Sequence, residues 1–292
     1  MIKIIVNPQA DKGESLLLWK DLEKKLKRLG IVYETVFTEY EKHATHLARK
    51  VQREGTKFIL VVGGDGTVSE VVNGIYLEDI VLGIIPTGSG NDFAKMIGIR
   101  TIQDGLNSLN SSYKKVVDVG FLNKDKYFIN NFGIGLDTYV VAKQRQIKFK
   151  HELSYLFSTL KILFNFSTFP IEVKSSDFKF SGNALSISIG NGQFHGGLFR
   201  LTPQAKIDDG FLDVCIIKEV NKLKRFLNIP KAIRGSHLSL KEVESFKTKN
   251  ISIYSSIPLP FHLDGELFEP LKELEIVILP KKLTFSTPNY DL

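Results

Sequence analysis

The 292-residue chain is poor in sulfur-containing side chains, with a single cysteine and two methionines. One cysteine can form no disulfide within the chain and cannot build a cysteine-based metal site. Cys215 lies in the apolar run 212–217, which predicts a strand that buries the thiol. This cysteine usage fits a reducing compartment, so we expect a cytoplasmic protein.

Long apolar runs are also lacking. No stretch reaches the roughly 18 uncharged apolar residues that a membrane-spanning helix needs. The N-terminal run 1–6 is too short for the core of a signal peptide. The sequence therefore predicts neither secretion nor a spanning helix. The segment Leu153–Phe166 is rich in apolar and aromatic residues, which fits a packed core helix or, alternatively, a surface for acyl chains.

The charges are unbalanced, with 39 basic and 32 acidic residues and a net charge of +7. Such an excess fits an ordinary solvated surface, or attraction to nucleic acid, anionic lipid or a phosphorylated substrate. No segment resembles a nucleic-acid-binding motif, so we expect no nucleic-acid partner. The composition, 43% apolar and 24% charged, excludes disordered and fibrous classes.

The length allows two domains, and the residue pattern changes near Phe121. Up to that point, apolar strand-like runs alternate with helical patterns, which predicts a doubly wound, mostly parallel α/β sheet. The expected strands are 3–6, 32–37, 58–62 and 81–85, with helices at 14–29 and 43–52. Residues 1–121 are therefore predicted to form a nucleotide-binding domain, which residues 283–292 could complete.

Residues 122–282 are predicted to form a β-rich, antiparallel and sandwich-like domain. The expected strands are 127–132, 171–173, 184–190, 212–218, 249–255 and 274–279, interrupted by helical stretches at 153–166 and 222–233. An exposed edge strand could mediate a homodimer.

Two glycine-rich turns follow neighbouring predicted strands: Gly63-Gly64-Asp65-Gly66-Thr67 and Pro86-Thr87-Gly88-Ser89-Gly90-Asn91-Asp92. Both should leave the carboxyl edge of one parallel sheet, where open α/β sheets bind ligands. Glycine lets backbone N–H groups approach a polyphosphate, and a helix start adds unpaired donors. Thr67 and Glu70 fit a capping box, which predicts a helix beginning at Thr67. The turns therefore indicate a nucleotide phosphate site.

Five short motifs follow one another along the chain. They are Asn7-Pro8, the first glycine turn with Glu70 and Asn73, the second turn continued through Ala94, Asp208-Asp209-Gly210, and Leu263-Asp264-Gly265-Glu266. Over nearly the whole chain this order resembles the diacylglycerol kinase catalytic-domain family, and the size resembles its soluble bacterial lipid kinases. One departure is His195-Gly196-Gly197-Leu198, where the family often has three glycines. His195 and His262 are expected to be positional.

The resemblance implies ATP and Mg²⁺ as cofactors. The implied ATP-binding residues are Asn7, Thr38, Gly63, Gly64, Asp65, Gly66, Thr67, Glu70, Thr87, Gly88, Ser89, Gly90 and Asn91. Asp65, Asp92 and Asp118 match acidic positions that gather round Mg²⁺, partly through waters. Asp209, with main-chain oxygens near Lys206 and Phe211, matches a second, structural Mg²⁺ site.

Asp264 matches the general base of the family, and Glu266 would point the same way if the segment is extended. The implied activity is transfer of the γ-phosphate of ATP to a lipid hydroxyl, with diacylglycerol as the expected acceptor and phosphatidic acid as product. The ATP site is expected in the cleft between the domains, and the lipid at a membrane surface that the protein joins peripherally. The alternatives are an NAD kinase-like phosphotransferase and a non-catalytic lipid or nucleotide sensor.

Overall fold

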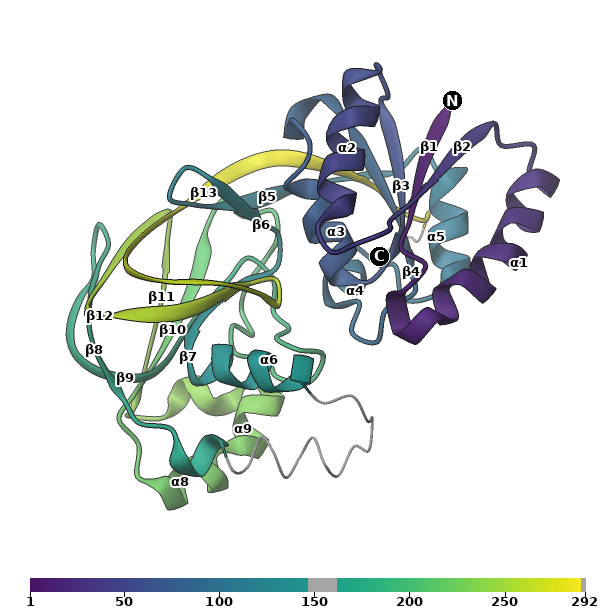
Figure 1. The fold of residues 1–292 in the computed structure, drawn as a ribbon. Helices are drawn as coiled ribbons and strands as arrows, with labels where there is room; N and C mark the ends of the chain where they lie inside the picture. The colour runs from purple at the N-terminus through teal and green to yellow at the C-terminus, as the bar shows by residue number, and fades with distance from the viewer. Residues whose placement is uncertain (147–161, 290–292) are drawn as a thin grey trace. The chain divides into compact units, whose positions relative to one another are not determined.

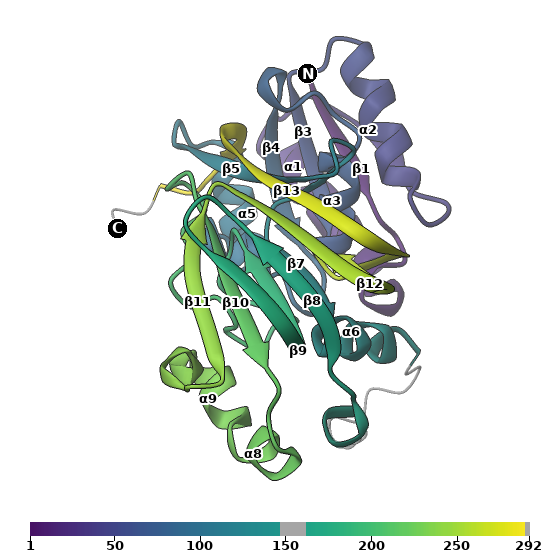
Figure 2. The same cartoon turned by 90° about the vertical axis from the view of Figure 1, so that its left-hand side faces the viewer.

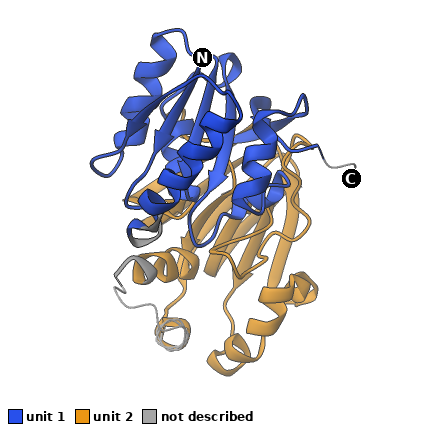
Figure 3. Cartoon of the chain, turned by 90° about the vertical axis from the view of Figure 1, so that its right-hand side faces the viewer, with its two compact units in different colours: residues 1–119, 280–292 blue, residues 120–279 orange. Residues whose placement is uncertain are grey.

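The computed structural model describes residues 1–146 and 162–289. The chain folds as two compact units: unit 1 holds residues 1–119 and 280–292, and unit 2 holds residues 120–279 (Figure 3). The sequence placed these boundaries at 121 and 282. Strands β5 (Lys114–Leu122) and β13 (Glu266–Ser286) run through the boundaries. The sequence composition does not mark these boundaries sharply, because the chain passes from one unit to the other within a strand and not in a linker.

Unit 1 contains a parallel sheet. Its strands, in spatial order, are the end of β13, β4 (Val81–Pro86), β3 (Phe58–Gly63), β1 (Ile2–Val6) and β2 (Tyr33–Phe37). The central strands are apolar and buried almost throughout, as expected where both faces of a parallel sheet are covered. Thr284 and Phe285 of β13 pair with β4, so the end of the chain adds a strand to this sheet.

Helices cover this sheet on both faces (Figure 1). They are α1 (Glu14–Arg28), α2 (His43–Arg53), α3 (Asp65–Val72), α4 (Asp92–Met96) and α5 (Ile102–Leu109), with short 3-10 turns at Ala10–Gly13 and Leu77–Asp79. Trp19, Leu22 and Leu26 of α1 pack with Leu106 of α5 over β1, β3 and β4. Figure 1 shows α2 and α3 on the opposite face. Unit 1 is therefore a doubly wound α/β sheet.

Unit 2 is built from antiparallel strands. They are β6 (Lys126–Phe128), β7 (Asn131–Gly135), β8 (Phe169–Lys174), β9 (Lys179–Gly190), β10 (Leu212–Lys218), β11 (Val243–Thr248), β12 (Asn250–Leu263) and the first part of β13. The long strands β9 and β12 each pair with both β7 and β8, which closes a circuit of four strands. Phenylalanine, isoleucine and leucine side chains from these strands form one core. The sequence predicted this antiparallel, sandwich-like character.

Unit 2 also carries helices α6 (Leu136–Gln146), α8 (Lys222–Leu227) and α9 (Ile229–Arg234), and a 3-10 turn at Ser236–Ser239. The predicted helix 222–233 is interrupted at Asn228, where Pro230 follows. The predicted helix 153–166 lies mostly outside the described residues, of which 162–165 are helical. None of the helices in residues 1–146 and 162–289 is long and apolar enough to cross a membrane.

Cys215 lies buried on β10, with its Sγ 3.5 Å from Nε2 of His237. Burial raises the pKa of the Cys215 thiol to about 12, so little thiolate exists at neutral pH. We expect native protein to resist a thiol reagent such as dithionitrobenzoate at pH 8 for hours, whereas urea-unfolded protein should react with one equivalent. Rapid stoichiometric labelling of the native protein would contradict this burial.

Candidate active site

The residues expected to bind ATP lie at one edge of the unit 1 sheet. Asn7 follows β1, Thr38 follows β2, Gly63 ends β3 and Thr87 follows β4. Because the four strands are parallel, these positions share the carboxyl edge of the sheet. That edge is where open α/β sheets bind ligands.

The first glycine turn leads directly into α3, which begins at Asp65 with Gly64 as its N-cap. Thr67 therefore lies inside the helix, and its Oγ1 accepts a hydrogen bond from Asn7 Nδ2 at 3.0 Å. Glu70 Oε2 accepts from the backbone N–H of Ala44, in the first turn of α2, at 3.1 Å. The predicted capping box is wrong. The partners of the Thr67 and Glu70 side chains come from other parts of the fold and not from the start of their own helix.

The two glycine turns contact each other through their backbones. A Cβ on Gly88 would lie 2.6 Å from Gly64 Cα, and the Thr87 N–H donates to Gly63 O at 3.1 Å. Asn91, at a φ of +52°, closes the second turn, since its Oδ1 accepts from the Gly88 N–H at 3.1 Å. Glycine at position 88 is therefore required by packing.

Asp65 joins the first turn to the helix after the second. Its Oδ2 accepts from the N–H of Asp92 at 3.0 Å, and its Oδ1 accepts from the N–H of Phe93 at 3.1 Å. These two residues begin α4, so the Asp65 carboxylate satisfies donors that the helix itself leaves unpaired. Asp65 thus fixes the position of one turn against the other.

The remaining acids expected at Mg²⁺ also have partners in the protein. Asp92 is buried, with Lys95 Nζ 3.6 Å from its Oδ1. Asp118 is fully buried and accepts from the N–H of Lys281 at 2.8 Å. Within residues 1–146 and 162–289, no group of three or more histidine, cysteine, aspartate or glutamate side chains is placed to hold a metal ion. Mg²⁺ usually keeps several waters and binds one or two carboxylates plus substrate phosphates, so Asp65 and Asp92, which the structure brings together, fit a metal bound together with a nucleotide.

Thr87 and Thr38, the threonines expected at ATP, also have partners at this edge of the sheet. Thr87 Oγ1 lies 3.2 Å from Oγ of Ser15, a fully buried residue in the first turn of α1. The Thr38 N–H donates to Val6 O at 2.9 Å, which continues the β1–β2 pairing. Sequence reasoning missed Ser15, because a serine at the start of an amphipathic helix reads as an ordinary helix-start residue.

A substitution at Gly66 can test ligand binding by a glycine turn without disturbing its packing. A Cβ on Gly66 meets nothing within 4 Å and its backbone is helical, so alanine fits the protein alone. We expect Gly66→Ala to keep or slightly raise thermal stability but to weaken ATP binding at least tenfold, because the methyl group would block close approach of phosphate. Gly88→Ala should instead destabilise the fold. Calorimetric ATP titration and thermal melts measure both, and unchanged ATP affinity in Gly66→Ala would exclude a phosphate at this position.

In unit 2, Asp264 and Gly265 form the two-residue turn between β12 and β13. Their φ angles are +48° and +81°, and Leu263 pairs with Glu266, as in a type I′ hairpin. The Asp264 carboxylate accepts from the N–H groups of three consecutive residues, 129, 130 and 131, at 3.0, 2.9 and 2.8 Å. Burial raises the pKa of Asp264, and these hydrogen bonds offset part of the rise.

The hairpin fails the condition attached to Glu266. Only an extended segment would point Asp264 and Glu266 in the same direction. The turn instead lies between them, and Glu266 begins the returning strand. The argument from strand alternation therefore does not apply to this pair.

A buried cluster of charged and polar groups lies behind this hairpin. Asp137 Oδ2, on α6, is 3.3 Å from His262 Nε2 and 3.5 Å from His195 Nδ1. It also accepts from Ser188 Oγ at 3.1 Å. Burial opposes ionisation of Asp137, but the two histidines outweigh it and hold the pKa of Asp137 well below its ordinary range.

His262 has a neighbour on each side of its ring. The Gly265 backbone N lies 3.4 Å from His262 Nδ1, and Asp137 Oδ2 lies 3.3 Å from His262 Nε2. His262 thereby connects Asp137 to the Asp264–Gly265 turn. Sequence reasoning missed Asp137, because no motif surrounds it and the partners of its carboxylate lie more than 50 residues away.

The acids near position 209 already have a positive partner. Asp209 Oδ2 and Asp213 Oδ2 lie 2.6 Å and 3.0 Å from Lys247 Nζ, and Asp209 Oδ1 accepts from the Phe211 N–H at 3.1 Å. Lys206 lies in the same loop and is exposed. The Lys247 ammonium supplies the charge that a second metal would supply, so this donor set does not fit the implied structural Mg²⁺.

Unit 2 also contains an apolar pocket of about 160 Å³. Leucine, isoleucine, valine and phenylalanine side chains from α6, β9, β10 and the α8–α9 region form most of its wall. Asp137, Arg225 and His237 are among its few polar residues. Pockets for drug-sized ligands usually measure roughly 300–1,000 Å³, so this one would take part of an acyl chain.

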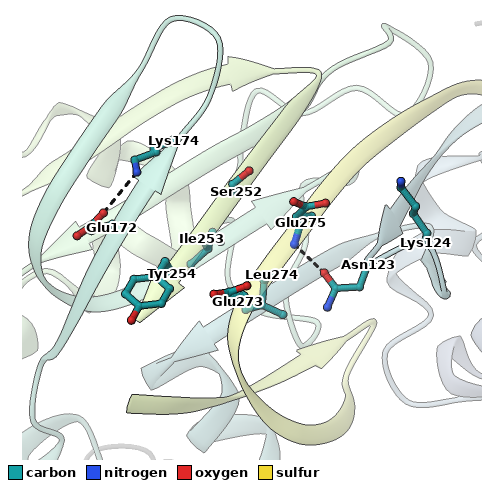
Figure 4. Close-up of a pocket in the computed structure, with 10 residues that line it drawn as sticks. All are labelled: Asn123, Lys124, Glu172, Lys174, Ser252, Ile253, Tyr254, Glu273, Leu274 and Glu275. Atoms are coloured by element: carbon teal, nitrogen blue, oxygen red, sulfur yellow. Dashed lines mark hydrogen bonds and ion pairs between the residues drawn. The ribbon is translucent and has the colours of Figure 1, made fainter. Parts of the chain in front are cut away.

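A second hollow, of about 630 Å³, lies over β8, β12 and β13 (Figure 4). Its lining combines apolar side chains with acidic and basic ones, and Glu172 lies 3.6 Å from Lys174. Asn123 Oδ1 accepts from the Glu275 N–H at 2.7 Å. This hollow holds none of the residues expected to act in catalysis.

A doubly wound sheet with paired glycine turns at its carboxyl edge, followed in the chain by a β-rich unit with a partly buried acidic hairpin, is the architecture of a nucleotide-dependent phosphotransferase. Residues 1–122 match the diacylglycerol kinase catalytic domain, and residues 131–286 match the YegS C-terminal NAD kinase beta sandwich-like domain. The chain belongs to the diacylglycerol kinase catalytic-domain family and is a lipid kinase of that family.

Relatives and solved structures agree with this assignment. A Bacillus subtilis protein named "Putative lipid kinase YtlR" is 30% identical over 90% of this chain and 92% of its own length. A diacylglycerol kinase of Staphylococcus aureus is 30% identical over 90% of this chain and 85% of its own. A solved diacylglycerol kinase from Bacillus anthracis has a TM-score of 0.73 and 25% identity, over 98% of this chain and 96% of that one. A solved NAD kinase from Archaeoglobus fulgidus, in complex with ATP, shares the fold alone, with a TM-score of 0.56 and 10% identity.

Proposed function

We propose that this protein transfers the γ-phosphate of ATP to a lipid hydroxyl, with diacylglycerol as acceptor and phosphatidic acid as product. The observation that carries the proposal is the Asp264 carboxylate, held by three backbone N–H groups in a partly buried hairpin. Relatives named diacylglycerol kinase support the choice of acceptor.

The phosphate donor is assigned to the carboxyl edge of the unit 1 sheet. Backbone N–H groups at the start of α3 and in the second glycine turn would hold the triphosphate. Asp65, Asp92 and Asp118 would hold Mg²⁺, partly through waters. When bound, the metal ion would offset the negative charge of the phosphates. Asp65 also keeps the two turns in register through its hydrogen bonds to the start of α4.

Asp264 is the proposed general base. It would accept the acceptor's hydroxyl proton while the hydroxyl oxygen bonds to the γ-phosphorus and the bond from that phosphorus to the bridging oxygen breaks, which releases ADP. A pKa raised by burial makes the carboxylate a better proton acceptor than an exposed aspartate. His262 and Asp137 would hold the hairpin in place behind it.

The acceptor's acyl chain is assigned to the apolar pocket of unit 2. The pocket wall includes Asp137, which lies 3.3 Å from His262, two residues before Asp264. A lipid with its acyl chain in this pocket would therefore lie close to Asp137 and His262, the polar groups that adjoin the Asp264 hairpin.

Radiolabelled ATP separates the candidate functions. Purified protein is incubated with Mg²⁺ and labelled ATP, and with diacylglycerol micelles, a total lipid extract or NAD. Labelled phosphatidic acid is the expected product. Labelled NADP would instead support the NAD kinase-like alternative, and saturable ATP binding without turnover on any acceptor would support a non-catalytic sensor.

A further inference from the structure

Helices α8 and α9 leave their apolar side chains uncovered. Figures 1 and 2 show the two helices side by side beyond the end of β10. Leu223, Phe226 and Leu227 share one face of α8 and are 68%, 45% and 65% exposed. In the part of the chain that the structure describes, neither helix has a buried residue. A helix of a globular domain normally buries such a face, so this one calls for a partner.

The segment that carries this face is basic, and its Lys224 pairs with Glu242, just before β11, at 3.0 Å. Between Lys222 and Arg234 the sequence has five basic residues and no acidic residue. Lys222, Lys231 and Arg234 are exposed. Exposed apolar side chains flanked by lysine and arginine are the composition of helices that lie in the interface of an anionic membrane.

Arg225, the partly buried cation of α8, connects this helix to neighbouring backbone. Arg225 Nη1 donates to Phe166 O at 2.6 Å and to Leu163 O at 3.1 Å, and its Nε donates to Val220 O at 2.8 Å. Lys222 Nζ lies 4.9 Å from the ring centroid of Phe164, which is itself exposed. The helix that carries the exposed Leu223–Phe226–Leu227 face is therefore bonded to the rest of unit 2.

The opposite side of the same helices lines the apolar pocket of unit 2. Arg225, Asn228, Ile229, Ala232 and Ile233 contribute to the pocket wall. We infer that the Leu223–Phe226–Leu227 face, with its flanking cations, docks unit 2 onto an anionic bilayer and brings the pocket to the lipid surface. The purpose of this docking rests on the proposed lipid acceptor, whereas the docking itself needs neither ATP nor turnover.

Sedimentation of the full chain with vesicles tests the inference. Phosphatidylcholine vesicles are compared with vesicles containing one third phosphatidylglycerol, at low and high salt. We expect binding mainly to the anionic vesicles and a loss of binding at high salt. Replacing Leu223, Phe226 and Leu227 by glutamine should weaken binding at least tenfold.

Two further variants complete the design. One variant removes three exposed cations: Lys222→Gln, Lys231→Gln and Arg234→Gln. It should bind anionic vesicles more weakly by roughly fivefold per cation removed. The matched control replaces Leu17, Val32 and Tyr76, equally exposed residues of unit 1, by glutamine and should bind like the unaltered protein. Equal binding to both vesicle types, or equal losses in the test and control triples, would overturn the inference.

A shift in oligomeric state for the α8 triple, with vesicle binding unchanged, would also overturn it, since the face would then be a protein interface. Turnover of a short-chain, monomeric diacylglycerol distinguishes the two proposals. The α8 triple should retain this turnover while losing vesicle binding. Absence of turnover in the unaltered protein, with vesicle binding intact, would count against the proposed function only.

Discussion

Asp264→Asn is expected to lower kcat for lipid phosphorylation by about 100- to 10,000-fold, the usual contribution of a general base, and to leave ATP affinity within about twofold. Asparagine tolerates the φ of +48° and keeps one oxygen for the Asn130 and Asn131 N–H groups. It removes the charge that would accept the proton. Steady-state kinetics and ATP titration measure the two effects.

The control for Asp264→Asn must match its cost in stability. Asparagine leaves the Ile129 N–H without its acceptor, which costs about 1 to 3 kcal/mol. Gly265→Ala disturbs the same turn through its φ of +81°, where an added Cβ meets nothing within 4 Å, and costs about 1 kcal/mol. If Gly265→Ala loses as much activity as Asp264→Asn, the carboxylate is a structural feature and not the base.

The pH profile gives an independent test of Asp264. A general base must be ionised, and burial raises the pKa of this carboxyl above its ordinary value of about 3.9. The acid limb of kcat/KM should therefore lie above pH 4, and activity should fall as the pH drops through it. The residual activity of Asp264→Asn should lack this limb.

Asp137→Asn is expected to destabilise unit 2 by about 3 to 5 kcal/mol at pH 7, the usual cost of removing one partner from a buried ionic cluster. The variant leaves His195 and His262 facing an amide in a buried site. Urea unfolding followed by circular dichroism measures the loss. Asp177→Asn, an exposed aspartate in the same unit, should change stability by less than about 0.5 kcal/mol.

The effect of Asp137 should depend on pH in one direction. The folded protein holds the pKa of Asp137 below its value in the unfolded chain, which is about 3.9. Its stabilising contribution is therefore complete above about pH 4 and is lost as the pH falls toward the folded-state pKa. The difference between the unaltered protein and Asp137→Asn should shrink below pH 4. A difference that grows on acidification would show that Asp137 is not ionised in the folded state.

Local sequence patterns predicted several features because their causes are local. Apolar runs at 58–62 and 81–85 followed by glycine turns fix buried parallel strands, since the turn residues must sit where the strands end. The Asp264–Gly265 pair between apolar runs is a hairpin pattern by itself, so the extended segment on which the expectation for Glu266 depended does not form.

Other features depended on residues far apart in the chain. Glu70 was read as half of a capping box, but a neighbouring helix offers its backbone N–H to that carboxylate. The family resemblance implies a metal at Asp209, but β11 places Lys247 against this carboxylate. In each case a partner that is distant in the sequence decides what the carboxylate binds.

The sequence by itself determined the strand and turn order, the two glycine-rich turns and the acids that could serve phosphoryl transfer. These follow from backbone sterics and the burial of apolar runs, which act over a few residues. Only the tertiary structure decided that Asp65 joins the two turns, that Asp137 supports the Asp264 hairpin through His262, and that the α8 face is uncovered. These facts depend on which groups the fold brings within hydrogen-bond distance and which apolar surface it leaves without a neighbour.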